Sequence, residues 1–270
     1  MKKQQAQEAI GVSDLKGVVS DVVCDNFSND GWTRTTVCSP SEMELTIYIN
    51  NQELVTILCT PNKLNCLVLG FLYSEGIISG TGDVLSMRVC DDETTADVRL
   101  SNSEYELPRL RTLTSGCGGG ATFKTKGKKI DSDFIISAEQ VLSMMKQLYE
   151  QMNIYRICGG VHTSALSDSE NLLVVAEDIG RHNTLDKIQG ECLLRDLTTR
   201  DKLLLSSGRV SSEMLLKAAK MQTPVVVSPH SPTGSAISLA HELGIALVGY
   251  ARGSRMSVYS HSERLGCSTN

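Results

Sequence analysis

Aromatic residues are scarce in this chain, and it carries no excess of positive charge. Aromatic residues make up 4% of the 270 positions, and the formal net charge is −5 at pH 7. A surface that stacks nucleic-acid bases needs aromatic side chains, and a field that attracts nucleic acid or a membrane needs a basic excess. We therefore expect neither partner. The length is ample for one large domain or two smaller ones.

Signals for metal binding and secretion are missing as well. The nine cysteines include no Cys-x-x-Cys pair, and their odd number and irregular spacing argue against zinc sites and a disulfide framework. Most lie in apolar runs, where a free thiol packs as a small hydrophobic group, as is usual in a reducing cytoplasm. The first residues lack an apolar signal core, and no run is long enough to span a bilayer. The sequence predicts a soluble, cytoplasmic protein without a metal.

The chain also lacks a GxxxxGK[ST] loop, a GxGxxG turn and an HExxH helix. Its most informative feature is instead Cys117, which has Gly116 before it and three glycines directly after it. A glycine-rich backbone adopts positive φ readily and can be approached closely by a ligand or partner. We interpret the segment as an exposed loop whose thiol a partner can reach. The alternative is a linker that happens to contain a cysteine.

Hydrophobic periodicity in the first half indicates a small α+β unit. Residues up to about 30 are polar, and one short strand is expected there. An Asn50-Asn51 turn between two alternating segments predicts a hairpin, and a helical repeat stops at Gly76. The expected strands are 17–23, 44–49, 54–59, 84–90 and 96–100, and the expected helix is 62–75.

The pattern changes near residue 137. Ser137 and Gln140 form a capping-box signature that opens a helix through Met152. Further helices are expected at 181–195, 212–220 and 233–243, and strands at 172–176, 202–205, 225–227, 246–249 and 256–259. This alternation predicts an α/β layer structure with mostly parallel strands. We expect two domains: residues 1–136, which end in the Cys117 loop and a basic linker, and residues 137–270.

Four consecutive strands of the second half end in loops rich in glycine, serine and arginine. The carboxyl ends of strands form the ligand crevice of an open α/β sheet, and three of these loops lead into helix N-termini, which favour anions. The loops would bring Arg181, Arg209, Arg252 and Arg255 to one edge. Arginine suits bidentate phosphate recognition, so the sequence predicts a site for a phosphorylated, nucleotide-like ligand. Each loop alone is weak support, because surface arginine is common.

Two histidines are further candidates. His182 and Asp186 lie one helical turn apart, either as a proton-handling pair or as a surface pair worth about 0.2–0.5 kcal/mol. For His182 we favour a structural or ligand-orienting role. His162 lies between glycines and small residues and fits a capped turn as well as a functional position. A cysteine hydrolase that uses Cys117 and His162 is an open alternative.

Six segments of the chain form a recognisable set. They are Cys59-Thr-Pro61, Gly70–Gly76, Ser115–Gly120, Glu177–Lys187, Ser207–Met214 and Leu247–Arg255. Together they resemble the formate dehydrogenase accessory sulfurtransferase (FdhD) family over roughly residues 45–265, and the stretch that begins at Glu177 is the most specific of them.

The resemblance implies a sulfur relay. A cysteine desulfurase would load sulfane sulfur as a persulfide on Cys117, which would pass it to the molybdenum cofactor of formate dehydrogenase, Mo-bis molybdopterin guanine dinucleotide. Guanine nucleotide would mimic part of this ligand. The family's cofactor segment maps onto Tyr250, Ala251, Arg252, Gly253, Ser254 and Arg255, to which the strand-end argument adds Arg181, His182 and Arg209.

The resemblance further implies a homodimer and a three-layer second half with the fold of cytidine deaminases. The deaminase zinc signature is missing, so neither zinc nor deamination is expected. Many members carry two cysteines in the loop, but here the second position is Gly120. A disulfide within the loop is therefore impossible, and a non-catalytic cofactor-binding chaperone is the alternative function. A resolving role for Cys158 or Cys267 stays open.

Overall fold

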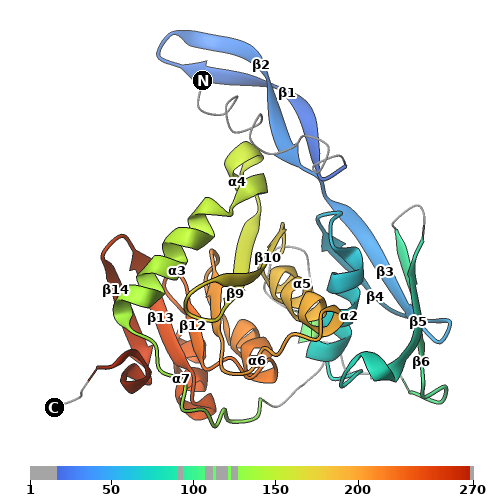
Figure 1. The fold of residues 1–270 in the computed structure, drawn as a ribbon. Helices are drawn as coiled ribbons and strands as arrows, with labels where there is room; N and C mark the ends of the chain where they lie inside the picture. The colour runs from blue at the N-terminus through green and yellow to red at the C-terminus, as the bar shows by residue number, and fades with distance from the viewer. Residues whose placement is uncertain (1–16, 91–93, 107–111, 114–120, 123–126, 268–270) are drawn as a thin grey trace.

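Two helix-covered β-sheets form the body of the molecule, and a long β-hairpin projects from it (Figure 1). The computed structural model describes residues 17–90, 94–106, 112–113, 121–122 and 127–267. Cys117 and Gly120 lie outside the described residues. The small strands β7 (Thr112–Leu113) and β8 (Ala121–Thr122) pair on either side of that gap.

The first sheet has four strands in the order β4-β3-β6-β5. Its bounds are β3 Met43–Ile49, β4 Gln52–Cys59, β5 Val84–Val89 and β6 Thr95–Leu100; helix α2 spans Leu64–Ser74 and the 3-10 turn η2 spans Thr81–Asp83. Asn50 and Asn51 both have positive φ (48° and 67°), the backbone that a two-residue hairpin turn requires. The predicted α+β unit is confirmed in these elements.

The projecting hairpin consists of β1 (Val19–Ser28) and β2 (Gly31–Pro40). The sequence predicted one short strand here, and that prediction is wrong in extent. Most side chains of both strands are exposed, so there is no buried face whose alternation a periodicity analysis could detect. At the tip, the rings of Phe27 and Trp32 lie 5.1 Å apart.

The second sheet has six strands in the order β10-β9-β11-β12-β13-β14. Its strands are β9 His162–Ser167, β10 Leu172–Asp178, β11 Leu203–Ser206, β12 Val225–Val227, β13 Ala246–Arg252 and β14 Arg255–Ser260. Only the β11–β12 and β12–β13 pairs are parallel, and the other three are antiparallel. The prediction of mostly parallel strands is therefore wrong for the pairing of neighbours, although β10, β11, β12 and β13 run in the same direction.

The unanticipated strand β9 accounts for much of this difference, because it inserts as an antiparallel strand between β10 and β11. Most of its residues are small or polar, with Leu166 as the single large apolar side chain, yet Thr163, Ser164 and Ser167 are buried. Hydrogen bonds satisfy their hydroxyl groups: Thr163 donates to Glu177, and Ser164 bonds Thr184 and Ser206. A central strand of this kind carries no hydrophobic signal in the sequence.

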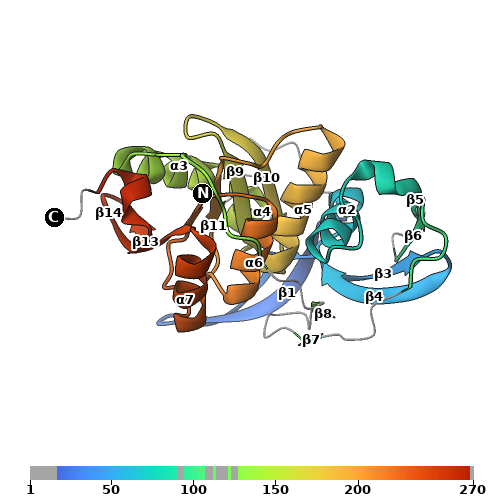
Figure 2. The same cartoon turned by 90° about the horizontal axis from the view of Figure 1, so that it is seen from below.

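Helices cover both faces of this sheet, which confirms the predicted three layers (Figures 1 and 2). Helix α3 (Ala138–Glu150) begins with the predicted capping box at Ser137 and packs on one face. Helices α5 (Arg181–Leu194), α6 (Ser212–Lys220) and α7 (Gly234–Leu243) pack on the other. A short helix α4 (Asn153–Cys158) and a 3-10 turn η3 (Ser262–Leu265) complete the fold.

The two sheet units meet where α2 packs against α5, side by side in both views (Figures 1 and 2). Glycines allow this approach. A Cβ on Gly70 would lie 1.7 Å from the Asp186 carbonyl oxygen, and one on Gly190 would lie 1.8 Å from that of Cys66. Each helix thus places a glycine under the backbone of the other. The domain division at residue 137 stays a prediction.

Among the helices of the described residues, none combines the length and the apolar character that a bilayer crossing requires.

Candidate functional site

The carboxyl ends of four strands meet at one edge of the six-stranded sheet. β11, β12 and β13 are parallel, and β9 is antiparallel to both β10 and β11, so all four strands β10 to β13 run the same way. The arginine-bearing loops therefore lie at a common edge, as their sequence predicted. This is the place where open α/β sheets bind ligands.

Contacts link the strand-end loops to one another. Ser228 Oγ donates to the Gly208 carbonyl at 2.7 Å, and Arg252 Nη2 lies 3.2 Å from His230 Nδ1. A Cβ on Gly208 would lie 3.1 Å from His162 Nδ1 and 3.3 Å from Arg181 Cβ. A Cβ at position 208 would therefore be tight against both side chains, and glycine eases the approach of the strand-end loops.

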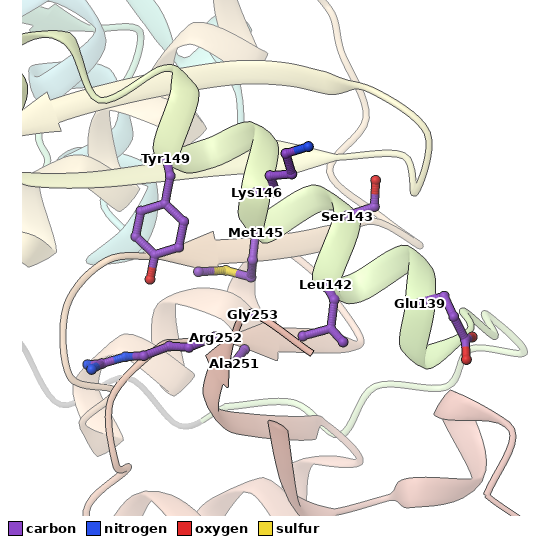
Figure 3. Close-up of a pocket in the computed structure, with 9 residues that line it drawn as sticks. All are labelled: Glu139, Leu142, Ser143, Met145, Lys146, Tyr149, Ala251, Arg252 and Gly253. Atoms are coloured by element: carbon purple, nitrogen blue, oxygen red, sulfur yellow. The ribbon is translucent and has the colours of Figure 1, made fainter. Parts of the chain in front are cut away.

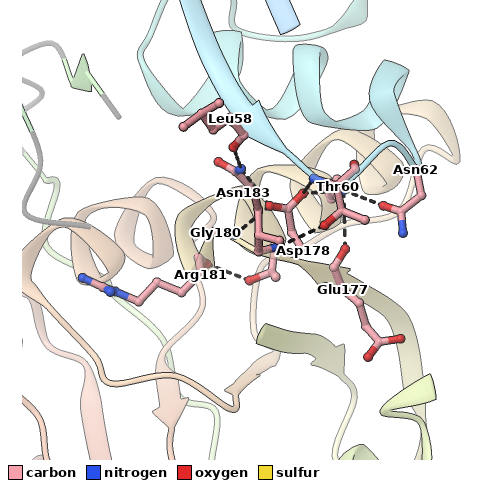
Figure 4. A network of polar contacts seen from close by, with 11 residues as sticks. Leu58, Thr60, Asn62, Glu177, Asp178, Gly180, Arg181 and Asn183 are labelled. Atoms are coloured by element: carbon pink, nitrogen blue, oxygen red, sulfur yellow. Dashed lines mark hydrogen bonds and ion pairs between the residues drawn. The ribbon is translucent and has the colours of Figure 1, made fainter. Parts of the chain in front are cut away.

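Asp178, in the most specific segment, is a structural junction between the two halves (Figure 4). The carboxylate is fully buried and accepts hydrogen bonds from the backbone of Thr60 at 3.1 Å and of Gly180 at 2.8 Å. Asn183 donates to it at 2.8 Å and also to the Leu58 carbonyl at 2.8 Å. The end of β4 is therefore attached to the start of α5.

Lys187 supplies the charge that balances Asp178. Its ammonium lies 2.6 Å from the carboxylate, both side chains have no exposed surface, and it also donates to the Thr60 carbonyl and Asn62. A buried ion pair needs this degree of hydrogen bonding to offset the loss of hydration. Glu177 also has a structural role, since its carboxylate accepts hydrogen bonds from the backbone N–H groups of Ile154 and Tyr155 at the start of α4. Burial raises the pKa of Glu177, against the lowering effect of those N–H groups.

Asp186 does not pair with His182. Both oxygens of its carboxylate lie 2.6 Å from Lys217 Nζ, and the carboxylate also accepts a hydrogen bond from Ser74 at 2.8 Å. Burial raises the pKa of Asp186, while Lys217 acts in the opposite direction. The proton-handling pair considered from the sequence is therefore wrong, because Asp186 joins α2, α5 and α6.

Arg181 is different from its neighbours in the same segment. Its side chain is only 9% exposed, yet Nε and Nη2 have no hydrogen-bond partner. In Figure 4 the guanidinium extends away from the Asp178 network. An unpartnered buried cation is costly, so this residue is a candidate for ligand binding rather than for structure.

Two histidines and a glutamate surround Arg181. Burial, with the positive charges of Lys217 and Arg181, lowers the pKa of His182 to about 3. Burial and Arg181 also lower the pKa of His162. Glu213 Oε2 lies 3.2 Å from His182 Nε2 but is a buried atom without a hydrogen bond, and burial raises the pKa of its carboxyl. Both imidazoles are therefore neutral near pH 7.

A pocket of about 410 Å³ lies between α3 and the end of β13 (Figure 3). Ala251, Arg252 and Gly253 form one wall. The other wall comes from α3: Glu139, Leu142, Ser143, Met145, Lys146 and Tyr149. The Tyr149 ring and the Arg252 guanidinium lie at the same end, and the volume is within the range of small-molecule sites.

The remaining predicted residues are at or near this edge. Arg209 follows β11 and is exposed, and Ser254 and Arg255 form the exposed turn into β14. Tyr250 is 48% exposed with φ of 53°, a strained backbone for a tyrosine. The catalytic candidate Cys117 lies outside the described residues. Within the described residues, no group of three or more histidine, cysteine, aspartate or glutamate side chains could hold a metal ion.

Neither the α3 wall of the pocket nor the position of Glu213 beside His182 was predicted from the sequence. Tyr149 and Lys146 belong to a helix that precedes the sheet strands, and their polar positions looked like an ordinary solvated helix face. Glu213 was visible as an acidic residue in the first turn of α6, but only the fold places it beside His182.

The fold defines an α/β protein whose arginine-bearing strand-end loops lie at one edge of the six-stranded sheet. The model of the FdhD/NarQ family matches residues 40–266, and the chain belongs to this family. It is 41% identical over 233 residues to the "Sulfur carrier protein FdhD" of Bacillus pumilus (strain SAFR-032), and 39% identical over 233 residues to the protein of that name from Staphylococcus aureus (strain MRSA252). Each alignment covers 83% of this chain and 88% of the relative.

A crystal structure from Desulfotalea psychrophila, described as a formate dehydrogenase accessory protein, has a similar fold. The TM-score is 0.76 at 22% sequence identity, and the match covers 92% of this chain and 99% of the other.

Proposed function

We propose that this protein is a sulfurtransferase that carries sulfur to the molybdenum cofactor of a formate dehydrogenase. A cysteine desulfurase loads Cys117 with sulfane sulfur, and the acceptor is Mo-bis molybdopterin guanine dinucleotide, bound as substrate before its insertion. Family membership and the names of the relatives support the sulfur-carrier role. The proposal places the protein in the cytoplasm as a homodimer.

The observation that carries the proposal is the pocket beside Ala251, Arg252 and Gly253. These residues come from the segment that resembles the family's cofactor segment, and they line a cavity of about 410 Å³. Apolar Leu142 and Met145 suit the faces of a planar base. We assign the guanine-bearing part of the ligand to this pocket, and its phosphates to the arginines of the strand-end loops.

The chemistry needs one thiol. The Cys117 thiolate attacks the outer sulfur of the desulfurase persulfide, the sulfur–sulfur bond of the donor breaks, and the donor leaves as a thiolate. A persulfide on Cys117 results with no net oxidation. A second attack on the same outer sulfur, by the acceptor, returns Cys117 to the thiolate. Because Gly120 removes the second loop cysteine, the carrier state must be a single persulfide.

Mass spectrometry after incubation with a cysteine desulfurase and free cysteine tests this step. We expect one added sulfur atom on Cys117 and none in the Cys117→Ser variant. Cys267→Ser is the matched control, because Cys267 is another thiol, exposed near the carboxyl terminus, and its loss should leave the labelling unchanged. Absence of sulfur on Cys117 in the wild type would contradict the relay.

The second candidate function is a cofactor-binding chaperone without sulfur chemistry, which Gly120 favours. It predicts that Cys117→Ser still binds GDP and still restores formate dehydrogenase activity in cells that lack the wild-type protein. The sulfurtransferase predicts that GDP binding persists but activity is lost. The combination of the two measurements separates the candidates.

A further inference from the structure

We propose that Arg181 forms a phosphoryl-anion subsite at the junction of α5 and α6, separate from the pocket beside Ala251. The ligand class is a phosphate group, whether free or part of a nucleotide. Its use for the phosphates of the carried dinucleotide rests on the proposed function, but the anion site itself does not.

The geometry of the unpartnered atoms indicates the ligand. Nε and Nη2 of Arg181 are the two nitrogens on one edge of the guanidinium, and both are buried without a partner. Their N–H bonds point the same way, so they can donate to two oxygens of one anion. The edge that is left open is therefore the edge that binds phosphate or carboxylate in a bidentate manner.

Burial makes this open edge unfavourable in the absence of a ligand. The Arg181 side chain is 9% exposed, and a buried charged donor without a partner loses its hydration without compensation. Lys187 and Lys217, the other buried cations of this region, each have a carboxylate at 2.6 Å. Arg181 has no carboxylate within ion-pair distance among the described residues. An external anion would neutralise Arg181 in the way that the carboxylates neutralise the two lysines.

Two helix N-termini add donors to the same place. Arg181 is the first residue of α5, whose N-cap Gly180 has no side chain to occupy the free N–H groups. The N-cap of α6 is Ser211, whose hydroxyl makes no capping bond and lies 3.4 Å from His182 Nε2 instead. Burial raises the pKa of Glu213 in the first turn of α6, and the positive charge of Arg181 opposes this rise. Glu213 Oε2 lies 3.2 Å from His182, the next residue of α5. Backbone N–H groups at two helix starts that lack a side-chain cap favour an anion with several oxygens.

The other titratable groups at this place restrict the charge of the ligand. His162 and His182 are neutral and contribute hydrogen-bonding capacity rather than charge. Glu213 is the opposing group, since its carboxylate lowers the affinity for an anion whenever it is ionised. Lys217 is already neutralised by Asp186. Arg181 and the helix N-termini therefore carry the attraction, and removal of the Glu213 charge should strengthen it.

A row of polar residues joins this subsite to the pocket. Burial, Arg181 and His230 all lower the pKa of His162. Arg252 lies 3.2 Å from His230 and also lines the pocket. The row follows the ends of adjacent strands along one sheet edge. A ligand with a base in the pocket and phosphate groups along this edge would use both ends.

Titration of the full chain with inorganic phosphate, pyrophosphate and GDP, followed by calorimetry, tests the subsite. Arg181→Met should weaken pyrophosphate binding by about 10- to 100-fold, the loss expected for a bidentate charged contact. Glu213→Gln should strengthen it. Arg200→Met is the charge-matched control, because exposed Arg200 precedes β11 and so lies at the opposite edge of the sheet, and it should change nothing. A thermal melt of each variant shows that the fold persists.

The three ligands separate the possible results. A parallel loss of GDP and pyrophosphate affinity in Arg181→Met assigns the subsite to the nucleotide, while a loss of phosphate and pyrophosphate binding alone assigns it to a free anion. Unchanged affinity for all three ligands in a folded Arg181→Met variant overturns the subsite. If Arg181→Met leaves all three affinities unchanged but Tyr149→Ala or Arg252→Ala abolishes GDP binding, the proposed function stands and only the Arg181 subsite is overturned. Acetate binding equal to that of phosphate would overturn the assignment of ligand class.

Discussion

The polar clusters on the two sides of helix α5 differ in one property, which is whether their buried polar atoms have hydrogen-bond partners. On the side that faces α2 and β4, Lys187 and Asp178 are buried, paired and hydrogen-bonded. On the strand-end side, Arg181 is buried and Glu213 is partly buried, and both have buried polar atoms without hydrogen-bond partners. Both clusters are rich in charge, and composition alone does not separate them.

The difference distinguishes scaffold from site. A saturated buried network contributes to one geometry of the fold, because removal of any member leaves another one uncompensated. An unsaturated cluster costs stability in the free protein and gains most when a ligand binds. Four substitutions, from the largest expected effect to the smallest, compare the two clusters.

Lys187→Met should lower the free energy of unfolding by about 3–5 kcal/mol, since it leaves the Asp178 carboxylate buried without its cation. Urea unfolding at pH 7 measures the loss. The double variant Asp178→Asn, Lys187→Met should recover part of it, because the uncompensated charge is gone. A loss below 1 kcal/mol in the single variant would show that this cluster is not essential to the scaffold.

Gly70→Ala should lower stability by about 1–3 kcal/mol or more, because the new Cβ would lie 1.7 Å from the Asp186 carbonyl oxygen and force α2 and α5 apart. Gly82→Ala is the control, since a Cβ there meets nothing within 4 Å. Denaturation midpoints give the comparison. Equal effects of the two substitutions would mean that the helix contact tolerates separation, and that the network on this side does not depend on it.

Elements with a strong apolar pattern were predictable from the sequence. Helix α6 and strand β12 have the predicted bounds, Ser212–Lys220 and Val225–Val227. The apolar run of a buried strand and the apolar periodicity of an amphipathic helix are visible in the sequence of the element itself. Strand β9 and the β1–β2 hairpin were not predictable in this way. Strand β9 buries hydroxyl groups whose hydrogen-bond partners lie in other elements, and the β1–β2 hairpin buries few side chains.

The site was predictable as a place but not as a set of roles. Glycine- and arginine-rich strand ends indicated the edge where Arg181, His162 and Arg252 now lie. The sequence does not show that Asp178 is structural and Arg181 is not, because Asp178 is satisfied by Thr60, 118 positions away. Roles of this kind depend on contacts between distant segments, which periodicity and motifs do not report.

His182 should make stability depend on pH. Burial and nearby cations lower its pKa to about 3 in the folded protein, whereas an unfolded histidine titrates near 6.5. The stability that its neutral form contributes is therefore present above pH 6.5 and is lost as pH falls toward the folded value. Between pH 7 and 5, wild type should lose about 1–2 kcal/mol more than His182→Gln in urea unfolding.

Glu213, whose pKa is raised, acts in the opposite direction over this range but is common to both proteins. The difference between them therefore reports the histidine together with its contact to Glu213. Identical pH profiles for wild type and His182→Gln would mean that the imidazole is accessible to protons in the folded state, and the strand-end cluster would then be less dry than its burial indicates.

Arg181→Met should have the smallest effect on stability, within about 0.5 kcal/mol of wild type or slightly stabilising, because the lost guanidinium edge makes no hydrogen bond and its burial is unfavourable. The contrast with Lys187→Met, another substitution of a buried cation on the same helix by methionine, is the sharpest form of the comparison. Thermal melts without ligand and with saturating pyrophosphate measure it. We expect near-equal melting temperatures without ligand and a ligand-induced rise in the wild type alone, since a ligand stabilises only the folded state that binds it. A large loss of stability in Arg181→Met without ligand would place Arg181 in the scaffold and remove the distinction between the two sides of α5.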